Sequence, residues 1–227
     1  MIPRPDRPIA LALDVSDVEA AERLGSLLRA EVGVFKIGLE LFWARGPEAV
    51  RRIAALGPVF VDCKLHDIPS TVERASANVA RLDVAMFNVH ALGGEAMMRA
   101  AVEGARRGAS DAGVDVPMVL GVTVLSSHAG EALASPASLA WEAKQSGLDG
   151  VVVSGEDVRD VRDACGDEFC LVVPGIRPTG TNGHDQVRVL TPREAIERGA
   201  DYIVVGRAVT TAADPLGAAR AVARELH

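Results

Sequence analysis

Residues 58–67 read PVFVDCKLHD, an apolar run that leads straight into a cluster of charges. Successive side chains of a β-strand point to opposite faces, so Asp62 and Lys64 share one face and Val61 and Cys63 the other. A carboxylate and an ammonium on a buried strand are costly unless each satisfies the other. A second carboxylate, Asp67, follows closely. This pattern is typical of a lysine that holds and then delivers a proton beside a negatively charged reactant.

Outward from this stretch, runs rich in Val and Ile alternate with longer amphipathic stretches along the whole chain. The pattern predicts strands at residues 9–14, 34–38, 59–64, 84–90, 118–124, 150–154, 170–173 and 202–206. It predicts helices at residues 17–31, 46–56, 70–81, 95–112, 136–146, 156–164, 192–198 and 215–226. Parallel strands need crossover connections of about this length. The eight repeats therefore predict an α/β fold, a (β/α)8 TIM barrel that forms a single domain over residues 1–227.

A doubly wound open sheet is the alternative fold. Its usual nucleotide-binding turn, Gly-x-Gly-x-x-Gly, is missing after the first predicted strand, where residues 13–16 read LDVS. The barrel is therefore the favoured architecture.

Composition narrows the class of protein. The net charge is −7 and no cluster of Lys and Arg offsets it, which argues against a nucleic-acid partner. No apolar run reaches the roughly 18 residues that span a membrane, and residues 1–7 lack a signal-peptide core. We therefore expect a cytoplasmic protein with no membrane partner. The three cysteines are irregularly spaced and predict reduced thiols, and the five histidines lack the spacing of metal ligands, so no metal site is expected.

Polar residues recur where the predicted strands end, and a barrel enzyme works at the C-terminal ends of its strands. Asp14, Lys36, Asp62 and Lys64 occupy such positions on the first three strands. Folding alone does not readily explain charges at the same end of several apolar strands. After the seventh and eighth strands come the segments PGIR (residues 174–177) and GR (residues 206–207). Glycine allows close backbone approach and arginine grips phosphate oxygens with two parallel hydrogen bonds, so these loops predict a phosphate site.

Five segments in this order resemble the orotidine 5′-phosphate decarboxylase family. They are DCKLHDIP (residues 62–69), NVHA (88–91), VTVLSS (122–127), PGIRP (174–178) and GR (206–207). The resemblance extends from about residue 9 to residue 215. It implies an enzyme without cofactors that converts orotidine 5′-phosphate into UMP and CO2, the last step of de novo pyrimidine synthesis. It also implies a homodimer whose active sites lie at the subunit interface.

The resemblance also implies a role for each site residue. Lys64 is expected to donate a proton to C6 of the pyrimidine, and Asp62 to sit beside the leaving carboxylate. Asp67 is expected to serve the neighbouring subunit's site, with Ile68 and Thr71 following it. Asp14 and Lys36 are expected at the ribose, and Lys36 is also expected to support the charged array. Ser126 is expected at the base. The expected contacts around the phosphate are Arg177, Gln186, Gly206 and Arg207, and Pro174 is a further expected substrate contact. Gln186 is expected to lie on a closing loop.

Two other functions stay open at this point. A magnesium-dependent sugar-phosphate aldolase or decarboxylase on a similar barrel also uses Asp-x-Lys-x-x-Asp. Those relatives place an acidic metal ligand soon after the motif, whereas here residues 68–71 read IPST and Glu73 is already inside a predicted helix. A non-catalytic barrel that binds a phosphosugar is the third possibility. It does not explain why Lys64 lies between two acids.

Overall fold

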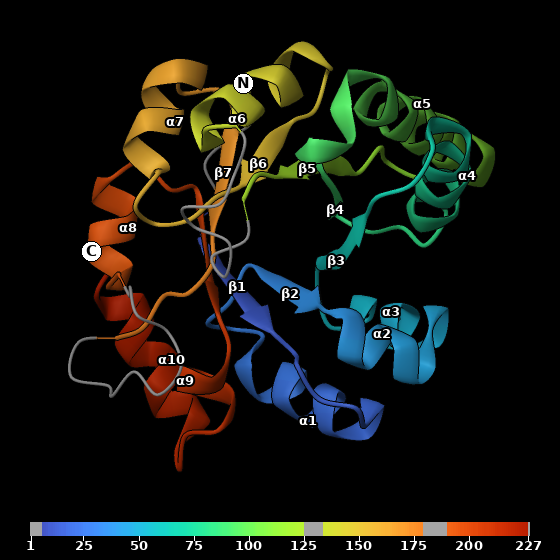
Figure 1. Cartoon of the computed structure of the whole chain (residues 1–227). Coiled ribbons are helices and arrows are strands. Elements are labelled where there is room, and N and C mark those ends of the chain that lie inside the picture. The colour runs from blue at the N-terminus through green and yellow to red at the C-terminus, as the bar shows by residue number, and fades with distance from the viewer. Residues whose placement is uncertain (1–5, 125–133, 179–189, 227) are drawn as a thin grey trace.

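Eight parallel strands form a closed barrel in the computed structural model, which describes residues 6–124, 134–178 and 190–226 (Figure 1). Each strand pairs with the next along the chain, and the last pairs with the first. The strands are β1 (Ile9–Ala12), β2 (Val34–Ile37), β3 (Val59–Leu65), β4 (Met86–His90), β5 (Met118–Val122), β6 (Gly150–Val152), β7 (Cys170–Val173) and β8 (Tyr202–Val205). The predicted TIM barrel is confirmed.

Helices surround the barrel and connect its strands. They are α1 (Val18–Leu28), α2 (Leu39–Arg45), α3 (Pro47–Ala54), α4 (Pro69–Ala80), α5 (Gly94–Ala112), α6 (Pro136–Gln145), α7 (Val158–Cys165), α8 (Pro192–Glu197), α9 (Arg207–Thr210) and α10 (Pro215–Arg224), with a 3₁₀ turn η1 (Ala91–Gly93). The expectation of eight helices was wrong in two places. Helix α2 is separate from α3 because Gly46 adopts a non-helical φ of +62°, which ends α2, and Pro47 then begins the next helix. The short helix α9, which follows β8 directly, is the second difference.

Alternation along the strands divides the core into two layers. Ile9 and Leu11 of β1 belong to the larger layer between strands and helices, whereas Ala10 and Ala12 point into the barrel. Apolar side chains from several other strands fill this interior: Val34, Phe60, Met86, Leu120, Cys170, Val172 and Val204. At the C-terminal ends of the strands, the positions that point into the barrel are therefore the ones that carry charged residues.

Strand β3 departs from simple alternation just where the charges begin. Val61 is opposite Phe87 and Leu65 is opposite Val89, so β3 has two more residues than β4 between these two pairs. Within this bulge Lys64 adopts φ +48°, a left-handed conformation that L-residues rarely take. The sequence predicted an even strand here, and a bulge that depends on the neighbouring strand leaves no local signal.

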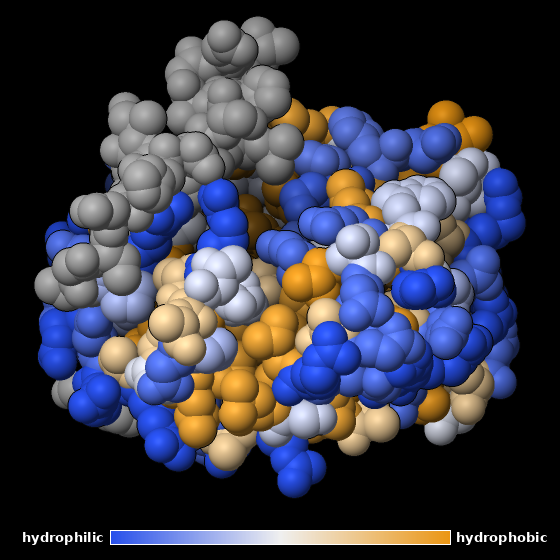
Figure 2. Space-filling view, turned by 90° about the horizontal axis from the view of Figure 1, so that it is seen from below, coloured by the Kyte–Doolittle hydropathy of each residue, from blue (hydrophilic) through white to orange (hydrophobic). Residues whose placement is uncertain are grey.

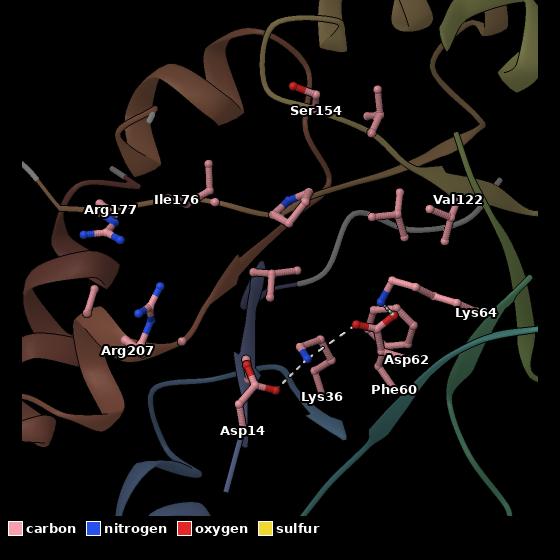
Figure 3. A pocket seen from close by; sticks show the side chains of 18 of the residues that line it. Asp14, Lys36, Phe60, Asp62, Lys64, Val122, Ser154, Ile176, Arg177 and Arg207 are labelled. Atoms are coloured by element: carbon pink, nitrogen blue, oxygen red, sulfur yellow. Dashed lines mark hydrogen bonds and ion pairs between the residues drawn. The ribbon is translucent and has the colours of Figure 1, made fainter. Parts of the chain in front are cut away.

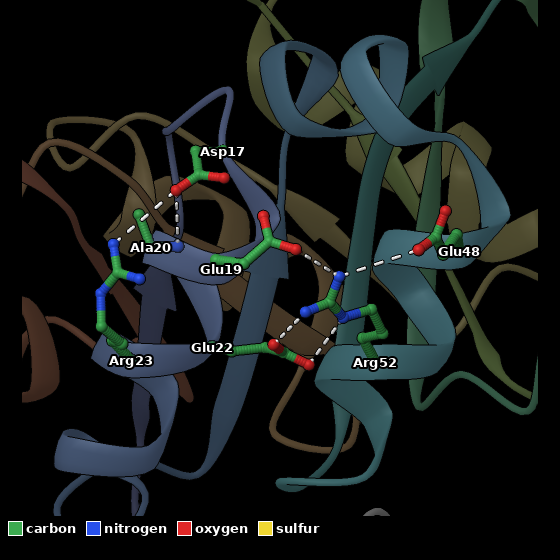
Figure 4. Close-up of polar contacts among 7 residues, drawn as sticks. All are labelled: Asp17, Glu19, Ala20, Glu22, Arg23, Glu48 and Arg52. Carbon is green, nitrogen blue, oxygen red and sulfur yellow. Dashed lines mark hydrogen bonds and ion pairs between the residues drawn. The ribbon is translucent and has the colours of Figure 1, made fainter.

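Salt bridges tie α1 to α3 on the outside of the first strands (Figure 4). The Arg52 guanidinium donates to Glu22 Oε1 and to Glu19 Oε1, each at 2.8 Å, and lies 3.7 Å from Glu48 Oε1. The hydrogen bond from Arg52 is the main reason that the pKa of Glu19 falls to about 2. Asp17 caps α1 by accepting the Ala20 N–H at 3.0 Å.

The molecular surface mixes hydrophilic and apolar residues. On the face seen from below, hydrophilic residues dominate the edges and apolar residues are interspersed towards the centre (Figure 2). Among the residues that the structure describes, no helix combines the length and the apolar character needed to cross a membrane.

Helices α4 and α5 pack side by side with their backbones in close contact (Figure 1). A Cβ atom at Gly104 would lie 2.1 Å from the carbonyl oxygen of Glu73, and one at Gly108 would lie 2.2 Å from that of Ala77. Both distances are far shorter than any van der Waals contact, so only glycine fits. The contact fixes the start of α4, which directly follows the segment that carries Asp67.

We predict that Gly104→Ala and Gly108→Ala each destabilise the protein. Helix propensity alone would make either change stabilising by up to about 1 kcal/mol, but the added methyl group must push two helices apart, at a cost of about 1–3 kcal/mol. Urea unfolding measures the difference. Ser110→Ala, at an exposed position of the same helix, is the control and should change the free energy of unfolding by less than about 0.5 kcal/mol. Stabilisation by either glycine substitution would contradict the close contact.

Candidate active site

A cavity of about 350 Å³ opens at the C-terminal ends of the strands (Figure 3). Its size is within the range of pockets that bind small molecules. Val122, Val152 and Val204 give it apolar walls, together with Phe60 of β3. Charged side chains stand at its two ends, with Asp62 and Lys64 at one and Arg177 and Arg207 at the other.

At the first end, four charged side chains form a chain of alternating sign (Figure 3). Asp14 Oδ1 lies 3.0 Å from Lys36 Nζ, which lies 3.4 Å from Asp62 Oδ2. The other oxygen of Asp62, Oδ1, lies 2.5 Å from Lys64 Nζ. The side chains of Lys36 and Asp62 are 9% and 15% exposed, so water screens their interaction only weakly. Each charge in the chain is thus held by a neighbour of opposite sign.

Two opposed effects determine the ionisation of Asp62. Burial alone would raise its pKa, because a desolvated carboxylate is unfavourable. The charges of Lys36 and Lys64 oppose burial, and hydrogen bonds to the carboxylate add to their effect. The balance lowers the pKa of Asp62 below its usual value, so Asp62 is an anion at neutral pH. The cavity therefore presents a negative charge in direct contact with a lysine ammonium.

Gly38 is a site residue that the sequence analysis missed. It follows β2, and a Cβ atom there would lie 3.0 Å from Asp14 Oδ1 and 3.1 Å from Lys36 Nζ. A larger residue would press on the pair that holds Lys36 in place. The only signal in the sequence is a glycine directly after a strand, which on its own reads as a turn.

The second end of the cavity is formed by the loops after β7 and β8. Gly175 adopts φ +77°, which favours glycine and turns the chain so that Arg177 lines the cavity. Gly206 precedes α9, and Arg207 is the first residue of that helix. The two guanidinium groups lie on the side of the cavity opposite Lys64 (Figure 3). Arginine side chains on one side of a cavity can bind an anionic group of a ligand.

Most of the residues expected in the site line this cavity. They are Asp14, Lys36, Asp62, Lys64, Pro174, Arg177, Gly206 and Arg207. Phe60 and Ser154 line it as well, and the sequence analysis gave neither of them a role. Ser126 and Gln186 lie outside the described residues, so their expected contacts stay predictions.

Asp67, Ile68 and Thr71 are not among the described residues that line the cavity. Residues 66–70 form an exposed segment, and the Asp67 carboxylate accepts the N–H of Ile68 at 2.7 Å. Although Asp67 is only three residues from Lys64, it is exposed and does not line the described cavity of its own chain.

Comparisons with known proteins agree with this geometry. Residues 7–222 match the model of the orotidine 5′-phosphate decarboxylase / HUMPS family. The chain is 46% identical to an orotidine 5′-phosphate decarboxylase from Moorella thermoacetica, across 96% of this chain and 92% of that protein. It is also 46% identical to one from Syntrophotalea carbinolica, across 97% and 95%.

Solved structures show the same architecture. The crystal structure of orotidine 5′-phosphate decarboxylase from Lactobacillus acidophilus superposes with a TM-score of 0.83 at 36% identity, covering 98% of this chain and all of that one. The enzyme from Pyrococcus horikoshii OT3 gives 0.80 at 25% identity, covering 96% and 98%. The chain belongs to the orotidine 5′-phosphate decarboxylase / HUMPS family.

Proposed function

We propose that this protein, acting as one domain over residues 1–227, decarboxylates orotidine 5′-phosphate to UMP and CO2 in pyrimidine synthesis. The observation that carries the proposal is the Lys64 ammonium bound to the Asp62 carboxylate at one end of a cavity whose other end holds two arginines. Relatives that align over nearly their whole length carry the name of this activity. The cavity suits a ligand with a reacting group at one end and a phosphate at the other.

The chemical step needs a proton at the right atom. When the bond between C6 and the carboxylate breaks, CO2 leaves and the electron pair stays on C6. Lys64 transfers a proton from Nζ to that pair, a C6–H bond forms, and the neutral amine regains a proton from water. Lys36 supports the array from the other side of Asp62, so the cavity supplies fixed charges in place of a cofactor.

Asp62 acts on the group that leaves. Its lowered pKa keeps it ionised, so a substrate carboxylate placed beside it meets a like charge. This repulsion disfavours the bound ground state and disappears as neutral CO2 departs. Lys36 pairs with one oxygen of Asp62 and Lys64 with the other, and these two ion pairs offset the free-energy cost of a buried carboxylate before substrate binds.

Binding energy from the far end of the cavity contributes to the same step. Very slow reactions require barrier reductions near ~20 kcal/mol, more than one lysine supplies. Arg177 and Arg207 would bind the phosphate, with Gly206 and Pro174 beside it. We infer that Gln186 closes over this phosphate and that Ser126 contacts the base. Interactions with a distant phosphate help to hold the reacting carbon against Lys64.

We infer that the protein is a homodimer in which Asp67 completes the partner's site. Large apolar side chains are exposed around the loops that follow β2, β3 and β4: Leu39, Trp43, Ile68 and Leu92. Trp43 is 79% exposed and Ile68 64%. Apolar residues of this size are usually covered when they gather next to a site. A second copy that covers them would bring Asp67, Ile68 and Thr71 to its partner's cavity, which Asp67 does not reach within its own chain.

A metal-dependent aldolase is the nearest alternative, and one contact argues against it. Glu73, the first acid after the motif, pairs with Arg107 of α5 and lies outside the described lining of the cavity. A non-catalytic phosphosugar-binding barrel leaves the Asp62–Lys64 pair unexplained. We infer that the reaction needs no cofactor, and that the protein is cytoplasmic, as its three free thiols favour.

We predict that Lys64→Ala abolishes turnover while the protein stays folded. Loss of proton donation and of the charge at C6 should lower kcat by at least about 10³-fold. Loss of orotidine 5′-phosphate absorbance measures it. Lys144→Ala is the control, because Lys144 donates to the Cys165 carbonyl outside the cavity, and its kcat should stay within about 3-fold of wild type. Substantial turnover by Lys64→Ala would contradict the role of Lys64 as proton donor.

Wild-type activity should also survive EDTA. Sensitivity to EDTA would favour the aldolase class.

Arg207→Ala should weaken both binding and turnover. Hydrogen bonds to a charged group contribute about 1.5–3 kcal/mol each, which corresponds to a loss of about 10- to 150-fold in kcat/KM. Orotidine, which lacks the phosphate, provides the matched test, because Arg207→Ala and wild type should process it equally slowly. Arg224→Ala, on the exposed face of α10, should have no effect on either substrate. An equal loss with both substrates would show that Arg207 does not act on the phosphate.

Mixing two inactive variants tests the shared site. In a hybrid dimer, Lys64→Ala of one subunit and Asp67→Ala of the other fall in the same shared site, so the second site keeps both residues and is intact. Random exchange of equal amounts should restore about one quarter of wild-type activity. Lys64→Ala mixed with Asp62→Ala is the control and should restore none, because each subunit then carries a broken site of its own. If native mass spectrometry shows hybrids without recovered activity, Asp67 does not act across the interface.

A further inference from the structure

Asn88 is fully buried in the middle of β4, directly across from the bulge of β3. Neither the sequence analysis nor the proposed reaction gives it a task. A buried side-chain amide has two donor protons and an acceptor oxygen to satisfy, so its partners show what it does.

Both polar atoms of the Asn88 side-chain amide form hydrogen bonds with the charged stretch of β3. Its Oδ1 accepts the backbone N–H of Lys64 at 2.7 Å, and its Nδ2 donates to Asp62 Oδ1 at 2.7 Å. The backbone carbonyl of Asn88 also accepts a hydrogen bond from the Cys63 thiol, with Sγ at 3.3 Å. The partners define the orientation of the amide, because an N–H needs an acceptor and a carboxylate needs a donor. One residue thus binds three consecutive residues of the neighbouring strand.

The bulge explains why such a residue is needed. The two extra residues of β3 interrupt the regular ladder with β4, and Lys64 takes the left-handed φ of +48°. A conformation of this kind persists only where the surroundings compensate for it. The Asn88 oxygen provides the hydrogen bond that the ladder no longer offers to the Lys64 N–H.

We propose that Asn88 is a positioning residue, whose amide holds the Asp62 carboxylate and the left-handed backbone of Lys64 at the same time. Asp62 Oδ1 accepts from Asn88 Nδ2 and from Lys64 Nζ, so the amide fixes the oxygen against which the ammonium rests. Displacement of a reacting group by about 1 Å can cost about 10²-fold in rate. This inference rests on the proposed decarboxylation, because it concerns the same lysine.

Two substitutions that keep the branched shape of the side chain separate the two hydrogen bonds. Asn88→Leu removes both. Asn88→Asp keeps the oxygen that accepts the Lys64 N–H, but it replaces the donor to Asp62 with a second carboxylate. Both variants should lower kcat by at least about 30-fold, while the dissociation constant of UMP stays within about 3-fold, because ribose and phosphate contacts are untouched. In Asn88→Asp, kcat relative to wild type should rise as the pH falls, because a protonated carboxyl again donates to Asp62.

Thr123→Val is the matched control for a buried hydrogen bond lost at the same end of the barrel. Thr123 is 1% exposed, and its hydroxyl donates to the Val152 carbonyl at 3.1 Å without lining the cavity. Its kcat should stay within about 2-fold of wild type even where its melting temperature falls.

Hydrogen exchange of the Lys64 amide, followed by NMR, tests the backbone part without any substrate. Exchange should be at least about 10-fold faster in Asn88→Leu than in wild type, and slow in Asn88→Asp. The proposal is wrong if folded variants keep kcat within about 3-fold, if UMP binding falls in parallel with kcat, or if Asn88→Leu leaves the exchange unchanged. If Asn88→Leu does not fold, Asn88→Ser, which also removes the amide, replaces it in both measurements. A wild-type protein without activity would overturn the proposed function instead, and the exchange result would still decide whether Asn88 holds Lys64.

Discussion

The Asp62 carboxylate lies between two ammonium groups, and the rest of the site depends on this interaction. Lys36 binds one oxygen and Lys64 the other, and together they outweigh the cost of burying the charge. Neither lysine is held by Asp62 alone. Asp14 binds Lys36 from the far side, and Asn88 anchors the Lys64 backbone. Lys64 is therefore part of a charge-balanced array, which keeps its ammonium group in one position.

The barrel makes such an array possible by separating apolar packing from polar chemistry along each strand. Inward side chains are apolar along the strands and become charged only where the strands end. The bulge in β3 adds two residues at that end, and both Asp62 and Lys64 line the cavity there. Fixed, desolvated charges are worth more here than in water, because the surrounding strands cannot reorganise to screen them.

The cavity is divided between reaction and recognition. Lys64 and Asp62 stand at one end and the arginines that follow β7 and β8 at the other. A substrate that spans the cavity lets its phosphate, which takes no part in bond breaking, contribute binding energy to the bond that breaks. The exposed apolar residues near Asp67 extend this logic beyond one chain, because a covering second copy would also exclude water from the site.

The sequence by itself determined the barrel, the strand order along the chain and the charged residues of the cavity, because periods of 2 and 3.6 and the polar ends of strands are local signals. It did not predict α2 and α9 as separate helices, since short helices depend on what they pack against. Only the tertiary structure decided the bulge at Lys64, the hydrogen bonds of Asn88 across from it, and the close approach of Gly38 to Asp14 and Lys36. Each depends on contacts between strands far apart in the chain. The place of Asp67 followed the same rule: although it is close to Lys64 in sequence, it lies in an exposed segment before α4 and is not among the described residues that line the cavity.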